Sequence, residues 1–105
     1  MIYNVKKGGK KVQIEILGTK YDFQYEDEPI EFDISVVGNV DYYKKTIVVE
    51  KNHKKLQDKI ARHELIHAYF YEAGLPDYAQ DEVLVEWLAL QFPKILEIFK
   101  KLENI

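Results

Sequence analysis

Two histidines and a glutamate in the stretch ARHELIHAYF, residues 61–70, are the side chains of this sequence best suited to do chemistry. His63 and His67 are four positions apart, so on a helix their imidazoles share one face at a separation of about 6 Å. This spacing suits one zinc ion, which takes histidine nitrogens at about 2.0–2.1 Å. Glu64 is rotated by about 100° around the helix, where it can accept a proton from a zinc-bound water without binding the metal.

A catalytic zinc site usually has three protein ligands and one open position, so the two histidines need a further partner. No histidine follows His67 and the chain has no cysteine, which leaves a carboxylate. Glu82 and Glu86 share a face in the stretch AQDEVLVEWLAL, and a short loop between antiparallel helices would bring them towards the histidines. We expect one to bind the metal and the other to orient a histidine by a hydrogen bond. Asp77 and Asp81 are weaker candidates.

The first half of the chain contains the pattern of β-strands. Alternating or β-branched apolar residues predict four strands, over residues 11–17, 20–26, 30–37 and 45–51. Gly38 and Asn39 indicate a turn or loop before the last strand. The segment TIVVE in that strand is either an edge that could pair with an extended peptide or a paired inner strand.

The second half of the chain contains the pattern of helices. The first helix covers about residues 54–73, is capped by Asn52 and ends before Gly74. The second starts near residue 79 and should kink or end at Pro93, after which a third amphipathic helix completes the chain. This order predicts an α+β fold, in which a small antiparallel or mixed sheet packs on the helix with both histidines and on a following helix that bears the third ligand. We expect the whole chain, 1–105, to form one domain.

Composition argues against several other functions. The chain is 47% hydrophobic and 31% charged with a net charge of −3, which is ordinary for a globular domain and gives no general attraction to nucleic acid. No apolar run approaches the roughly 20 residues of a membrane span, and the N-terminus lacks the apolar core of a signal peptide. We expect a soluble, cytoplasmic protein with no nucleic-acid or membrane partner. The oligomeric state does not follow from the sequence.

The motif HELIH, followed by a second helix reading DEVLVEWLALQFP, resembles the minimal gluzincin-type metallopeptidases. Among these it is similar to the ImmA/IrrE-like domains of phages and mobile elements. In that family a glutamate opens the second helix and a proline ends it eleven residues later, the separation between Glu82 and Pro93 here. The resemblance covers roughly residues 46–93.

The resemblance implies a zinc endopeptidase that cuts a cytoplasmic protein or peptide, with Glu64 activating a zinc-bound water. It assigns the zinc ligands to His63, His67 and Glu82, with Glu86 as an alternative ligand or outer hydrogen-bond partner. Two rival functions are a zinc-binding interaction module without turnover and a metal-free structural domain. A second donor to the reacting carbonyl is common in such sites, and the candidates are His53, Tyr69, Tyr71 and Tyr78.

Overall fold

The computed structural model describes residues 11–31 and 34–105, and in these ranges all strands precede all helices. The elements are β1 (Lys11–Ile16), β2 (Thr19–Glu26), β3 (Ile30–Glu31), β4 (Ile34–Ser35), β5 (Gly38–Asp41), β6 (Thr46–Glu50), α1 (Lys54–Glu72), α2 (Pro76–Ala79) and α3 (Glu82–Leu102). The α+β class predicted from the sequence is therefore confirmed.

Four of the strands form a mixed sheet in the order β1-β2-β6-β5. The β1–β2 and β5–β6 pairs are antiparallel, whereas β2 and β6 run parallel. The TIVVE segment is thus an inner strand, and among the described strands β5 forms one edge of this sheet and β1 the other. The predicted turn at Gly38 and Asn39 is wrong, because these residues open β5 and pair with Val49 and Val48.

The third predicted strand, over residues 30–37, is also different from expectation. Two short strands, β3 and β4, pair antiparallel and form a separate small sheet. Residues 32 and 33, which the prediction placed inside the strand, lie outside the described residues.

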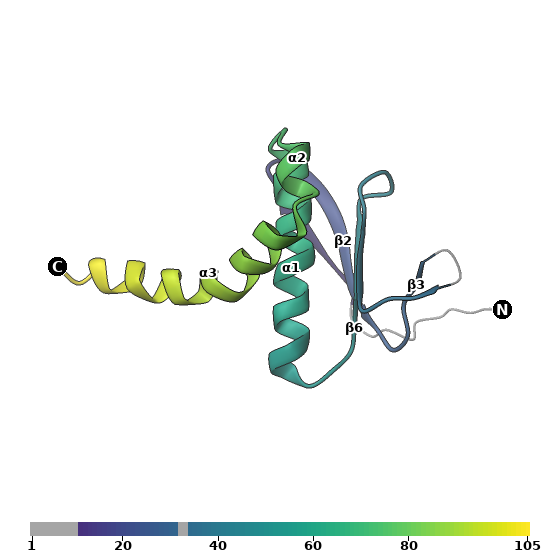
Figure 1. The fold of residues 1–105 in the computed structure, drawn as a ribbon, viewed down its shortest axis with the longest axis horizontal. Helices are drawn as coiled ribbons and strands as arrows, with labels where there is room; N and C mark the ends of the chain where they lie inside the picture. The colour runs from purple at the N-terminus through teal and green to yellow at the C-terminus, as the bar shows by residue number, and fades with distance from the viewer. Residues whose placement is uncertain (1–10, 32–33) are drawn as a thin grey trace.

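Helix α1 packs on one face of the sheet, which Figure 1 shows nearly edge-on beside it. The alternation along β2 and β6 places four side chains on that face, all of them buried: Tyr21, Phe23, Ile47 and Val49. They meet Ile60, Ala61 and Ala68 of α1. Removing this apolar surface from water stabilises the contact by about 25 cal/mol per Å². The core therefore fixes α1 against the sheet along the length that includes both histidines.

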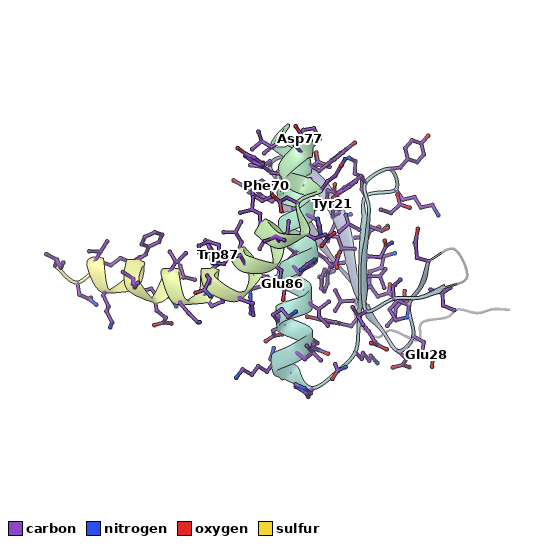
Figure 2. All side chains as sticks on the ribbon, in the orientation of Figure 1. Tyr21, Glu28, Phe70, Asp77, Glu86 and Trp87 are labelled. Atoms are coloured by element: carbon purple, nitrogen blue, oxygen red, sulfur yellow. The ribbon has the colours of Figure 1, made fainter. Side chains whose placement is uncertain are left out.

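A polar network ties the end of α1 to the sheet. The Glu72 carboxylate accepts hydrogen bonds from Lys45 at 2.8 Å, from the Tyr21 hydroxyl at 2.6 Å and from Thr19 at 3.0 Å. These bonds hold the pKa of Glu72 below its ordinary value, and the bond from Lys45 has the largest effect. Figure 2 shows Tyr21 in the space between α1 and the sheet.

The start of α1 differs from the prediction, while its end agrees with it. The N-cap residue is His53, which makes no side-chain capping bond, and Asn52 instead accepts a hydrogen bond from the His53 amide. Gly74 follows the helix with a φ of +79°, a left-handed conformation that glycine adopts without a steric penalty. No helix within the described ranges is long and apolar enough to cross a membrane.

Helix α3 continues through Pro93 instead of ending there, so the predicted third helix is its second half. A proline inside a helix lacks the N–H that would bond the carbonyl four residues earlier, here that of Ala89. Arg62 of α1 replaces this donor, since its Nε lies 2.8 Å from the Ala89 oxygen. In Figure 1 the first turns of α3 run beside α1, and the rest projects away from the sheet.

Candidate metal centre

Three side chains from α1 and α3 direct their donor atoms at one another. The Nε2 atom of His63 lies 3.1 Å from Nε2 of His67 and 3.1 Å from Oε1 of Glu82. The third side of this triangle, from His67 Nε2 to the same Glu82 oxygen, is 3.3 Å. The fold thus brings together the three side chains that the sequence indicated.

The ring nitrogen that points away from the triangle, Nδ1, has a hydrogen-bond acceptor in each histidine. His67 Nδ1 lies 2.6 Å from the carbonyl oxygen of Ala79, which only accepts, so this nitrogen donates. His63 Nδ1 lies 2.7 Å from Oε1 of Glu86. A hydrogen bond from Lys59 lowers the pKa of Glu86, so this carboxylate is ionised and also accepts. On both rings Nδ1 therefore acts as a donor to its outer partner, and Nε2 faces the other members of the triangle.

These three atoms form a group that could hold one metal ion. A single proton bridges only two of the three atoms, whereas a metal ion at the centre could bind all three. A tetrahedral zinc ion with bonds of about 2.0–2.1 Å places its ligands roughly 3.3–3.4 Å apart, close to the observed 3.1–3.3 Å. Two imidazoles and one carboxylate are also a usual set for catalytic zinc, so the residues fit this ion.

The geometry assigns different positions to the two glutamates that the sequence left as alternatives. Glu82 begins α3 and is the member of the triangle most open to solvent. Glu86, one turn later, accepts a hydrogen bond from Nδ1 of His63 at 2.7 Å. Its other oxygen lies 2.8 Å from the ammonium of Lys59, also on α1. Figure 2 shows Glu86 where α3 runs beside α1. A carboxylate at that position orients the imidazole and raises its basicity as a ligand.

Glu64 lies next to the two histidines but faces the sheet side of the site. Only 9% of its surface is exposed, and this burial raises its pKa, against the opposing effect of the histidines. Gly38 of β5 makes room for it, because a Cβ atom there would lie 2.7 Å from Glu64 Oε2. The absence of a side chain at Gly38 therefore leaves the space that this carboxylate occupies.

The triangle of His63, His67 and Glu82 opens, together with Glu64, into one cleft of about 520 Å³. Its walls come from β5 and the turn after it, from α1, and from the segment that joins α2 to α3. The lining residues are Gly38, Asn39, Val40, Tyr42, His63, Glu64, His67, Ala79, Gln80 and Glu82. The cleft is thus bounded by the edge of the sheet on one side and by the helices on the other.

The four residues proposed as second donors are absent from this lining. His53 is exposed at the start of α1, and Tyr69 lines an apolar groove between α1 and α3. Tyr78 packs edge-on against Phe70. The ring of Tyr71 stacks on the ring of Tyr42.

The two aspartates considered as weaker ligands have other positions. Asp81 is the N-cap of α3 and accepts a hydrogen bond from the Leu84 amide at 3.0 Å. Asp77 lies in the exposed first turn of α2. The cleft residue that the sequence did not indicate is Tyr42, because it follows a strand that was expected to be a turn.

Comparisons with known protein families, with curated proteins and with solved structures gave no significant match. The residues of the site and their geometry are therefore the basis for inferring a function.

Proposed function

We propose that this protein is a zinc-dependent endopeptidase of the gluzincin type. The observation that carries the proposal is the triangle of His63, His67 and Glu82, whose inward donor atoms lie 3.1–3.3 Å apart beside a buried glutamate. A buried carboxylate that is not itself a ligand is what hydrolysis requires and what a purely structural metal site does not need.

Bound zinc would supply a Lewis acid that polarises the substrate carbonyl and makes water more acidic. Glu64 is in position to accept a proton as the oxygen of water bonds to the carbonyl carbon. The same carboxylic acid then returns the proton to the amide nitrogen as the C–N bond breaks, so that one water is consumed per bond cut. Because burial raises its pKa, Glu64 is a stronger base than an exposed glutamate.

The edge of the sheet offers a way to hold the substrate. Strand β5 pairs with β6 on one side, and Gly38, Asn39 and Val40 line the cleft. An extended peptide can add to such an edge by main-chain hydrogen bonds, which are largely independent of its sequence. We therefore propose an extended segment of a protein as the substrate class.

Metal content and cleavage by matched variants test this function. Protein purified without chelator should contain close to one equivalent of zinc, and zinc-loaded protein should cut fluorescein-labelled casein or members of a mixed peptide library. Glu64→Gln should retain zinc and lose cleavage by about 100-fold or more. Glu103→Gln, an exposed position at the end of α3, is the matched control and should behave like the wild type.

Two results would reject the proposal at different levels. Absence of zinc uptake on titration would reject the metal centre. Retained zinc with no cleavage of any probe, or with equal rates for wild type and Glu64→Gln, would reject the hydrolytic role and favour a metal-binding interaction domain.

A further inference from the structure

The turn that follows β5 holds an aromatic side chain at the wall of the cleft. The Asp41 carboxylate accepts hydrogen bonds from the amides of Tyr43 at 3.0 Å and Lys44 at 2.8 Å. The Asp41 carbonyl accepts another from the Lys45 amide at 2.8 Å. Three bonds to one residue close the turn tightly, so the backbone of Tyr42 within it has little freedom.

The ring of Tyr42 is held as firmly as its backbone. It stacks on Tyr71 of α1 with the ring centres 4.1 Å apart and the planes 5° from parallel. The ammonium of Lys45 lies 5.1 Å from the centre of the same Tyr71 ring. Tyr42 is thus fixed to the helix that carries the histidines, although it belongs to the sheet half of the chain.

The hydroxyl of Tyr42 is a hydrogen-bond donor in its ordinary, protonated form. Burial has the largest effect on the pKa of Tyr42 and raises it above the ordinary value for tyrosine. The negative charges of Glu64 and Glu82 raise it further. Tyr42 lines the same cleft as these two carboxylates. Tyr21, by contrast, already donates its hydroxyl to Glu72 at 2.6 Å and is fully buried in the core.

We propose that Tyr42 is a catalytic residue whose hydroxyl donates a hydrogen bond to the oxygen of the substrate carbonyl while negative charge develops there. No proton is transferred in this step. The inference rests on the proposed peptidase function and adds a donor from the sheet side of the cleft, opposite the ligands on α1 and α3. Such a fixed donor acts on the transition state more than on the bound substrate, so it changes kcat more than KM.

The test compares Tyr42→Phe with Tyr43→Phe. The second variant is the control, because it removes a tyrosine hydroxyl from the neighbouring residue, which is 95% exposed. Phenylalanine keeps the ring that stacks on Tyr71, and thermal unfolding checks that the fold is retained. With labelled casein, Tyr42→Phe should lower kcat by about 100-fold with KM within about twofold. Tyr43→Phe should leave both within about twofold of the wild type.

A binding measurement provides a readout that does not depend on turnover. An N-phosphoryl-leucyl dipeptide presents tetrahedral anionic oxygens, as the reacting carbonyl does. Calorimetry should show an affinity for zinc-loaded Tyr42→Phe about tenfold weaker than for the wild type, because one donor to the anion is missing. Zinc affinity should be equal in both proteins.

The possible failures are distinguishable. If wild type cleaves casein and Tyr42→Phe cleaves it equally fast, Tyr42 is not catalytic and the peptidase proposal stands. If Tyr42→Phe also loses zinc or stability, the residue is structural and the assignment is overturned. If zinc-loaded wild type cuts no probe, the peptidase proposal itself fails and takes this inference with it.

Discussion

Replacing Gly38 with alanine should disable Glu64 while leaving the metal centre intact. A Cβ atom at this position would lie 2.7 Å from Glu64 Oε2, 2.9 Å from its Cγ and 3.0 Å from Cγ2 of Ile60. Optimal contacts between carbon atoms are about 3.5–4.0 Å, so the glutamate must move by roughly 0.6–1 Å. Because a misplacement of about 1 Å can cost about 100-fold in rate, we expect kcat to fall by about 10–100-fold.

The same substitution should have modest effects on folding and none on zinc affinity. Overpacking of this kind costs about 1–3 kcal/mol of unfolding free energy, measurable by urea denaturation. The zinc affinity, measured by competition with a chelating dye, should stay within about twofold, because the three atoms nearest to the added methyl group belong to Glu64 and Ile60. The assay for kcat is the cleavage of labelled casein.

Gly18→Ala is the control for a general loss of stability. Gly18 has a φ of +90° with open space around it, so alanine there strains the β1–β2 turn without touching Glu64. Its kcat should match the wild type even though the protein unfolds more easily. An unchanged kcat for Gly38→Ala, or a kcat that falls only together with zinc affinity, would refute the proposed link between Gly38 and Glu64.

Three further predictions concern the ligands and the packing around them. Glu86→Gln should weaken zinc binding by about 10–100-fold, and Glu82→Ala should weaken it more, as measured by dye competition; the reverse order would reassign the third ligand. Arg62→Ala should lower the unfolding free energy by about 1–3 kcal/mol, and by less in a Pro93→Ala background, where a main-chain N–H is restored; equal losses would contradict the role of Arg62. The hydrogen bonds to Glu72 lower its pKa, so they stabilise the fold above the unfolded pKa of 4.5, and this stabilisation is lost as pH falls through the lower folded value. Glu72→Gln should therefore flatten the acid side of the urea-stability profile, and an unchanged profile would exclude this origin.

The helical half of the site could be predicted because its signals are local. His63 and His67 must share a face of any helix, and the chain offers few carboxylates at a suitable distance after them. The left-handed Gly74 after α1 was also predictable, since its requirement is set by a few neighbouring residues. What the spacing alone left open was the choice between Glu82 and Glu86. Only the orientation of α3 against α1 decides which one faces the inner nitrogens.

The sheet half of the site depends on contacts that the sequence pattern does not encode. Gly38 and Asn39 have the composition of a turn, yet pairing with β6 and the need for space beside Glu64 place them in a strand. Pro93 normally stops a helix, yet α3 continues because Arg62, thirty-one positions earlier, bonds the carbonyl that the proline leaves without a partner. Both errors came from long-range contacts that override local propensity.

The division of the site between two halves of the chain has an evolutionary consequence. The side chains of the candidate metal centre and their hydrogen-bond partners lie on α1, α2 and α3, whereas the space for Glu64 and the opposite wall come from β5 and its turn. Under the proposed function, changes confined to β5 would therefore lower turnover without loss of the metal. On that proposal, one substitution in β5 would turn a peptidase into a metal-binding domain without turnover, and reversion at the same position would restore cleavage.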